Sequence, residues 1–451
     1  MFWLIYNVLL VLGAPVIVGL LLTKKRCQRG LLARLGQVPR VLQHLPGPVV
    51  WVHAVSLGEV TAVVPLLRNI KEEDPHQTIV VSTVTETGRE MVLKRLNGIA
   101  THCYAPLDFW WAVNRYIRVL NPRLFLLVES EIWPNLLACL EQHQVPVCLV
   151  NGRISSRSFS RYRLVKRLMK PIWSLLDMAL MQTTQDAERI KELGANAKVV
   201  HVTGNMKFDQ TFDCQKNFNS AQTIRATLGI SDSELVIVAG STHPNEEEQL
   251  LEAYQSLCHS HMNVVLIMAP RHVERAPELE AVIAHFGLSC VRRSQMSDKN
   301  ILTTQSPSPR VIVLDSQGEL PYVFCLGFVG FVGGTLVPIG GHNLLEPAQW
   351  GRPVIFGPYV DHCRDIAHQL LQARGAIQVH QPKDLVTHLL RLFEHPAEAE
   401  EMGRQALAVI QQNRGVVKEN LRLIGQLGIR QHGSLGPMSS SAASSVKAQI
   451  S

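Results

Sequence analysis

Three charged side chains in the first half of the sequence each come shortly after a short apolar run: Glu59, Glu129 and Lys207. Each run is typical of a buried strand, and ligands of open α/β sheets bind at the carboxyl ends of the strands. A carboxylate there is a candidate general base, and a lysine there can stabilise an anionic leaving group. The alternatives are acidic residues that complement a helix N-terminus, and a solvated lysine.

The second half of the sequence places phosphate-binding residue types in similar positions. Arginine binds phosphate in bidentate fashion, and the free amides at a helix start bind phosphate or ribose oxygens. A surface salt bridge and a plain N-capped turn are the alternatives. The candidate ligand-binding residues are Pro270, Arg271, Gln317, Gly318 and Glu319.

The densest pattern is the glycine-rich stretch 333–347. Glycines after a strand allow the backbone to approach a phosphorylated ligand closely. Asn343 and Glu346 are three residues apart, so both fall on one face of a helix start, with Leu344 and Leu345 between them. A carboxylate there can accept both hydroxyls of a ribose. A glycine-rich turn without a ligand is the alternative.

A basic stretch at residues 153–170 holds seven arginines and lysines and no acidic residue. It suits an anionic lipid surface or a phosphorylated acceptor, with a solvated helix face as the alternative. The net charge of +7 also favours an anionic partner. No aromatic interleaving or known module supports nucleic acid, so we expect none to bind.

Composition favours a folded protein, with 46% hydrophobic and 18% charged residues. Nine cysteines without a C-x-x-C pair indicate reduced thiols in a cytoplasmic setting. The sequence has no His/Cys cluster with zinc spacing, no Asp-x-Asp pair and no Walker A loop. We therefore expect neither a metal nor a cofactor.

Residues 2–22 are almost wholly apolar and uncharged, and the basic run 24–26 follows them. A helix of this length spans about 30 Å, roughly a bilayer core. The pattern predicts a membrane anchor that spans the bilayer or lies in its surface, with the rest of the chain on the cytoplasmic side. A cleaved signal peptide would carry its charge before the apolar run, and a buried core helix is the other alternative.

Short apolar runs alternate with helical stretches on both sides of a polar segment, which predicts an α/β fold with parallel sheets in two tandem domains. Facing strand ends would form a cleft. The expected order is an anchor helix at 1–23, a first domain at 24–209, a linker at 210–222, a second domain at 223–430 and a disordered Ser-rich tail at 431–451.

Taken together, six ordered segments resemble the Kdo (3-deoxy-D-manno-octulosonic acid) transferases of lipopolysaccharide and lipid A biosynthesis. They cover nearly the whole chain to about residue 425. Leu57 departs from the valine common in bacterial members, and the tail has no family counterpart. The matching segments are His53 to Glu59, Glu129 to Asn135 (E-S-E-I-W-P-N), Gly204 to Asp209 (G-N-M-K-F-D), Pro270 to His272, Gly318 to Leu320 and Gly340 to Pro347.

The resemblance implies a GT-B type fold, with two Rossmann-like domains facing a central cleft and no metal requirement. It implies that Glu59 is the general base and that Glu129 and Lys207 act on the transition state. The CMP-binding residues would be those at 270–271, 317–319 and 343–346.

The resemblance further implies transfer of Kdo from CMP-Kdo to the lipid A precursor (lipid IVA) with inversion. This would take place at the cytoplasmic face of the cell inner membrane, against its lipid surface. A UDP-sugar transferase or 2-epimerase is the alternative enzyme, and a non-enzymatic lipid or nucleic-acid binder is the alternative from another class.

Overall fold

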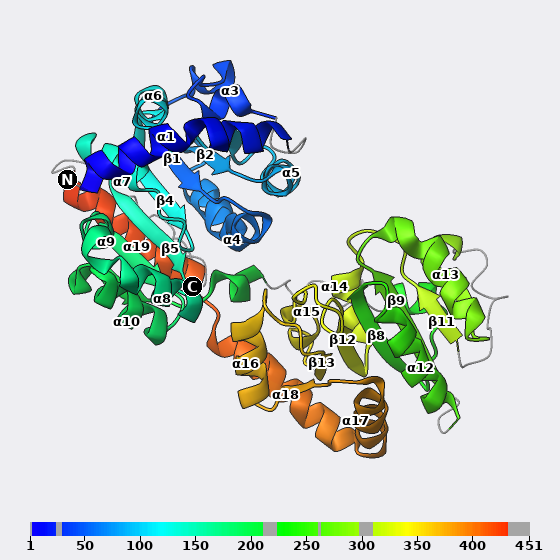
Figure 1. Ribbon diagram of the computed structural model, residues 1–451. Coiled ribbons are helices and arrows are strands. Elements are labelled where there is room, and N and C mark those ends of the chain that lie inside the picture. The colour runs from blue at the N-terminus through cyan, green and yellow to red at the C-terminus, as the bar shows by residue number, and fades with distance from the viewer. Residues whose placement is uncertain (1, 24–28, 211–222, 260–262, 297–309, 432–451) are drawn as a thin grey trace, which may run out of the picture. The chain divides into compact units, whose positions relative to one another are not determined.

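A computed structural model describes residues 2–23, 29–210, 223–259, 263–296 and 310–431 of the chain. It divides into a first unit, residues 1–210 with 415–451, and a second unit, residues 211–414 (Figure 1). The basic run 24–26 lies outside the described residues. Nearly all of the predicted linker and of the predicted tail also lie outside them.

The first unit is built on a seven-stranded parallel sheet in the order β3-β2-β1-β4-β5-β6-β7. Successive residues of β1 belong alternately to two apolar clusters, so the sheet is covered on both faces. The strands are β1 Val49–His53, β2 Thr78–Thr83, β3 Thr101–Tyr104, β4 Pro122–Val128, β5 Val147–Gly152, β6 Met178–Met181 and β7 Val200–Val202.

The helices of the first unit follow most of these strands in turn, as right-handed crossovers between parallel strands require. They are α1 Phe2–Thr23, α3 Leu31–Arg34, α4 Leu57–Glu73, α5 Glu86–Arg95, α6 Trp110–Leu120, α7 Pro134–Gln142, α8 Ser156–Leu164, α9 Lys166–Trp173, α10 Thr184–Leu193 and α19 Val416–Gln431. A 3-10 helix, η3 Met206–Gln210, follows β7.

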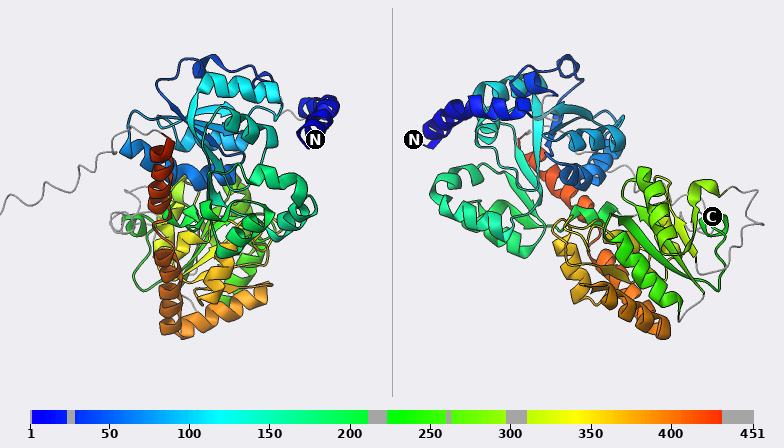
Figure 2. Two further views of the ribbon diagram at one scale, coloured as in Figure 1. Left: turned by 90° about the vertical axis from the view of Figure 1, so that its left-hand side faces the viewer. Right: turned by 45° about the vertical axis from the view of Figure 1, so that its right-hand side comes forward.

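The second unit has its own seven-stranded parallel sheet, in the order β10-β11-β9-β8-β12-β13-β14. Successive residues of β8 belong alternately to two further apolar clusters, so this sheet is also covered on both faces. Helices lie against the sheet in the ribbon view (Figure 2). The strands are β8 Leu235–Thr242, β9 Val264–Pro270, β10 Ser289–Arg292, β11 Arg310–Val313, β12 Val329–Val332, β13 Val354–Phe356 and β14 Ala376–Gln378.

Some helices of the second unit are long and cover the sheet. Others are single turns that lie in the segments after a strand end. The helices are α12 Glu247–Cys258, α13 Ala276–His285, α14 Leu320–Val323, α15 Leu345–Ala348, α16 Arg364–Gln372, α17 Pro382–Glu394 and α18 Pro396–Gln412. The predicted α/β fold class is thus confirmed for each unit.

Three strands that the sequence analysis did not anticipate, β3, β10 and β14, all lie at sheet edges. They are short, and their sequences mix polar with apolar residues: T-H-C-Y, S-C-V-R and A-I-Q. An edge strand pairs on one side only and is less buried than a central one. Its sequence therefore lacks the continuous apolar run that marks the central strands.

The last described helix, α19, corrects the predicted domain boundary at residue 430. It belongs to the first unit, although the sequence placed it at the end of the second domain. The reason is apolar burial: Val416, Leu423 and Leu427 lie in the cluster that also contains Val60 of α4. The Asp209 carboxylate fixes the start of the helix, because it accepts backbone hydrogen bonds from residues 415 and 417 at 2.8 and 2.6 Å.

The N-terminal helix α1 contacts the first unit through its first turns. Trp3 packs against the core, and the Tyr6 hydroxyl donates a 2.7 Å hydrogen bond to the buried Asp108 carboxylate. Asn7 and Asn135 exchange amide hydrogen bonds at 3.1 and 2.8 Å. Within the described part of the chain, none of the helices combines the length and apolar character needed to cross a bilayer. The predicted membrane anchor is therefore unconfirmed.

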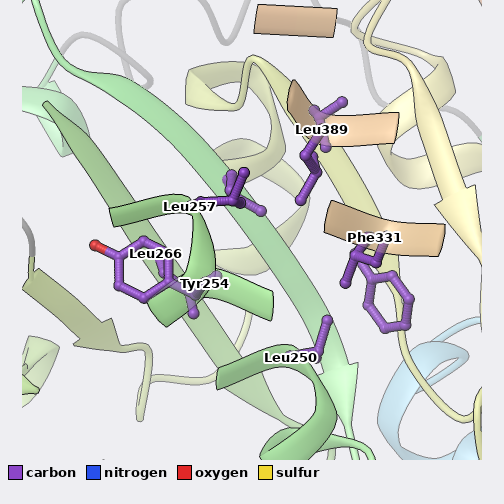
Figure 3. Close-up of a pocket in the computed structure, with 9 residues that line it drawn as sticks. Leu250, Tyr254, Leu257, Leu266, Phe331 and Leu389 are labelled. Carbon is purple, nitrogen blue, oxygen red and sulfur yellow. The ribbon is translucent and has the colours of Figure 1, made fainter. Parts of the chain in front are cut away.

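A small cavity of about 10 Å³ lies in the core of the second unit, between the sheet and the helices α12 and α17 (Figure 3). Its lining is apolar except for Tyr254, whose hydroxyl donates to the Val264 carbonyl at 2.6 Å. A single water needs about this volume together with polar partners, so the cavity is a packing gap. A larger hollow of about 430 Å³ lies in the first unit near the amino ends of β2 and β3.

The two hydrogen bonds from Asp209 predict that Asp209→Ala destabilises the first unit. The substitution leaves two backbone N–H groups without their acceptor, which should lower the free energy of unfolding by about 1–3 kcal/mol. Urea unfolding measures this loss, and amide exchange within α19 should accelerate. Asp232→Ala, at an exposed position of the second unit, is the control and should stay within about 0.5 kcal/mol of wild type. Equal stability of the two variants would contradict the assigned role.

Candidate active site

Glu59 lies in the first turn of α4, directly after β1. Ser56 caps this helix, and its hydroxyl accepts a hydrogen bond from the Glu59 amide. The Glu59 carboxylate turns back to the strand end, where it accepts the Val55 amide at 2.5 Å. Glu59 therefore lies at a helix start, as expected for the alternative in which an acidic residue complements the helix N-terminus. Its position at the helix start does not by itself explain the burial and the neighbouring charges of its carboxylate.

The environment of Glu59 disfavours a negative charge. The residue is only 6% exposed, and burial, the largest cause, raises the pKa of its carboxyl to about 8. The nearby carboxylates of Glu129 and Glu131 contribute to this rise, and the hydrogen bonds from Val55 and Ser56 oppose it. A carboxyl that titrates near neutral pH has the proton affinity that a general base needs.

Glu129 follows β4, the neighbour of β1 on the far side from β2. Its backbone has φ of 60°, in the left-handed region that non-glycine residues rarely adopt. Its amide donates to the Val150 carbonyl, which holds this conformation at the strand end. The strand order reverses between β1 and β4, so Glu59 and Glu129 flank the switch point, where such sheets bind ligands.

Lys207 lies in η3, which packs against α4. Its backbone amide donates to the Asn205 side chain at 3.0 Å, and Asn205 donates in turn to Gln182 at 3.0 Å. Gln182 then donates to the Asn151 carbonyl at 2.9 Å. This chain of buried amides links the ends of β5, β6 and β7 and fixes the backbone that carries Lys207.

The sequence analysis did not identify the supporting residues Asn151 and Gln182. Asn151 is fully buried, has φ of 54° and accepts the Met206 amide at 3.0 Å. Its one signal in the sequence is its position after the apolar run 147–150, which is the signal that revealed Glu129.

The buried His53 ends β1 beside this site. Its Nδ1 lies 3.0 Å from the Ser82 hydroxyl, and its ring packs edge-on to Trp133. Burial lowers the pKa of its imidazole to about 3, so the ring is neutral at physiological pH. His53 therefore adds no charge that would stabilise the Glu59 carboxylate.

In the second unit, the predicted residues also follow neighbouring strands. Pro270 ends β9, and the amide of exposed Arg271 donates to the Thr242 carbonyl at the end of β8, at 2.9 Å. Gln317 and Gly318 are exposed after β11. Because β11, β9, β8 and β12 are adjacent in the sheet, these groups share one carboxyl edge.

Glu319 is already engaged within its own loop. Arg293 forms an ion pair with its carboxylate at 3.1 Å, and the Ser316 hydroxyl also donates to it. Both contacts hold the loop that presents Gly318, whose φ is 89°. Through its side chain, Glu319 therefore shapes the loop.

Asn343 and Glu346 meet as the sequence predicted, with the Asn343 amide 3.3 Å from the Glu346 carboxylate. Leu344 and Leu345 have buried side chains, 0% and 3% exposed. Only the backbone of these two leucines is thus left to meet a ligand, because their side chains belong to the core.

Glu246, a residue without an assigned role in the sequence analysis, organises the glycine-rich loop. It is fully buried, and its carboxylate accepts the amides of Gly334, Leu336 and His243 at 2.6, 3.2 and 2.9 Å. Burial raises the pKa of this carboxyl to about 7, while these amides oppose the shift. A Cβ on Gly333 would lie 2.4 Å from a backbone oxygen, so the loop requires glycine there.

Two tandem units, each built on a parallel sheet covered by helices, are typical of the GT-B fold class. A solved UDP-GlcNAc 2-epimerase from Neisseria meningitidis shares the fold, with a TM-score of 0.57 over 84% of this chain and all of that one. The two sequences are 13% identical, so this likeness concerns the fold alone.

Residues 29–210 match the family model of the 3-deoxy-D-manno-octulosonic-acid transferases (Kdo transferases). A 3-deoxy-D-manno-octulosonic acid transferase of Haemophilus influenzae is 31% identical over 93% of this chain and 97% of its own length. One of Bordetella pertussis is 31% identical over 86% of this chain and 90% of its own length. The chain belongs to the Kdo transferases, a family of glycosyltransferases.

The raised pKa of Glu59 predicts a specific pH dependence of stability. Between about pH 4.5 and pH 8 the folded protein holds a proton on Glu59 that the unfolded chain releases. Over this window the free energy of unfolding of the wild type should therefore fall, as pH rises, relative to that of Glu59→Gln. Thermal unfolding of both proteins across the window measures the difference. The exposed Glu90→Gln is the control, and a gap that stays constant with pH would refute the assignment.

Proposed function

We propose that the enzyme transfers Kdo from CMP-Kdo to the lipid A precursor (lipid IVA) in lipopolysaccharide biosynthesis. Membership of the family supports the reaction class. The observation that carries the mechanism is the buried Glu59, a carboxyl whose pKa is raised to about 8 at the switch point of the first sheet. The proposed reaction uses no metal and no cofactor.

In the proposed step, Glu59 removes the proton from a sugar hydroxyl of the acceptor while that oxygen attacks the anomeric carbon of Kdo. The new carbon–oxygen bond forms as the bond to the CMP phosphate oxygen breaks, and CMP leaves with the electron pair. Attack and departure occur on opposite faces of the sugar, so the configuration inverts. The proton on Glu59 is then lost to solvent.

Glu129 and Lys207 are proposed to stabilise the charges of the transition state. A carboxylate suits the positive charge that develops on the sugar ring, and an ammonium group suits the negative leaving phosphate. The fixed backbone at both residues supports this, since a preorganised charge needs little rearrangement during the reaction.

CMP is proposed to bind the second unit through Pro270, Arg271, the 317–319 loop and the 343–346 segment. The shared carboxyl edge of these groups supports one continuous site. Arg271 is exposed and available to a phosphate, while Asn343 and Glu346 are placed to meet ribose hydroxyls.

The acceptor is proposed to meet the first unit from the cytoplasmic face of the inner membrane. The basic stretch forms α8 and α9, where most arginines are exposed beside Leu164 and Leu168, which are 88% and 48% exposed. Exposed apolar residues of α1, such as Leu9 and Leu12, add surface suited to lipid. Cationic and apolar groups together fit a phosphorylated lipid at a membrane surface.

Glu59→Gln should lower the rate of Kdo transfer by about 100-fold to 10,000-fold, because the amide cannot accept the proton. The measurement is the mass of the product formed from CMP-Kdo and lipid IVA by purified protein. Thermal stabilisation by CMP, compared with UDP, should be the same as in wild type and shows that the donor site is intact. Transfer at a near wild-type rate would rule out Glu59 as the base.

Neutralising three exposed arginines of the basic stretch should raise KM for lipid IVA by roughly tenfold or more, since each cation near an anionic surface contributes about 1 kcal/mol. The KM for CMP-Kdo should not change, and the salt dependence of the acceptor KM should weaken. A control variant removes the same charge from α4 and α5. If both variants behave alike, the basic stretch does not bind the acceptor. The test variant is Arg161→Gln/Arg163→Gln/Arg167→Gln and the control is Arg68→Gln/Lys94→Gln/Arg95→Gln.

A further inference from the structure

We propose that the paired imidazoles of His243 and His342 bind the phosphate of the nucleotide and take up a proton when it arrives. This inference rests on the proposed CMP donor and adds a phosphate-recognition group to the residues already assigned. Neither histidine belongs to the set predicted to bind CMP.

The two rings are close enough to share a proton. Their Nε2 atoms lie 2.7 Å apart, and the rings are nearly parallel, with a 10° interplanar angle. At this separation one nitrogen must donate and the other must accept, so the free pair holds one proton between the two atoms. A further proton is taken up at the free Nδ1 of the donating ring, which becomes an imidazolium whose Nε2–H still donates to the other ring.

The pair lies where the second sheet is expected to bind a ligand. His243 follows β8 directly, and His342 belongs to the loop after β12. These two strands are neighbours at the point where the strand order reverses. The Gly334 backbone lies close to the His342 ring, because a Cβ at position 334 would be only 3.1 Å from that ring.

The charged groups around the pair are mainly positive. Arg271 acts on both rings, and Arg275 acts on His243. Burial is the largest cause that lowers the pKa of His342 to about 4, and it also lowers that of His243. The free pair is therefore neutral at physiological pH.

The carboxylates nearby are committed to other partners. Glu247 forms an ion pair with Arg275 at 2.9 Å and accepts the Thr242 hydroxyl at 2.9 Å. Glu246 accepts three backbone amides of the glycine-rich loop and of His243. A phosphate dianion supplies both the negative charge and the acceptor oxygens that this cluster lacks. Its binding raises the proton affinity of the pair, which then takes one proton from solvent and becomes an imidazolium.

Calorimetric titration of the full chain with CMP tests the proposal. At about pH 8 the free imidazoles and the CMP phosphate are both largely deprotonated. Titrations in two buffers of different ionisation enthalpy should therefore report uptake of close to one proton per CMP bound. His342→Gln and His243→Gln each keep a polar side chain that cannot take up the proton. Both should lose the uptake and bind CMP about tenfold more weakly.

Two controls separate the phosphate from the rest of the ligand and the pair from other histidines. Cytidine, which lacks the phosphate, should bind without proton uptake and equally well to wild type and variants. His388→Gln, on α17 and outside the cluster, should keep the full uptake. If both pair variants still take up the proton on binding CMP, the role of the histidine pair is wrong and the proposed CMP donor stands. A wild type that does not bind CMP would overturn the proposed donor and this inference together.

Discussion

All strands within each sheet run in the same direction, and the arrangement of the site depends on this constraint. Parallel strands bring every carboxyl end to one edge, so residues far apart in the sequence become neighbours without long loops. Glu59 and Glu129 lie in this way on either side of the switch point of the first sheet, and His243 and His342 meet across that of the second. The strand order, and not proximity in the sequence, determines which residues lie together at the candidate site.

Each unit places a buried glutamate near its switch point, and the two differ in how their oxygens are used. Glu246 accepts three backbone amides, so its carboxylate oxygens hold the conformation of the glycine-rich loop. Glu59 accepts a single backbone amide and faces two other carboxylates, so it keeps a high affinity for protons. The same residue type thus shapes a loop in one unit and, in the proposed mechanism, transfers a proton in the other, because its hydrogen-bond partners differ.

Central strands and the residues just after them could be predicted from the sequence, because continuous apolar runs mark strands buried on both faces. Glu59, Glu129 and the Asn343–Glu346 pair were found from this signal and from their spacing. Three of the four edge strands, β3, β10 and β14, gave no such signal, whereas β7 did. Asn151 and Glu246 were missed for another reason: Asn151 accepts an amide 55 positions away, and two of the three amides that Glu246 accepts lie 88 and 90 positions away. These contacts form only in the tertiary structure.

The packing of α19 on the first unit determines when that unit can complete its core during synthesis. Val416, Leu423 and Leu427 complete the apolar cluster around α4, yet they are among the last described residues to leave the ribosome. The first unit therefore cannot finish its core during its own synthesis, and it waits while the whole second unit is translated. Closing contacts over such a separation is slow. The unit that carries Glu59 thus completes its core only when the chain is nearly complete, and a product truncated before α19 lacks the apolar side chains that pack around α4.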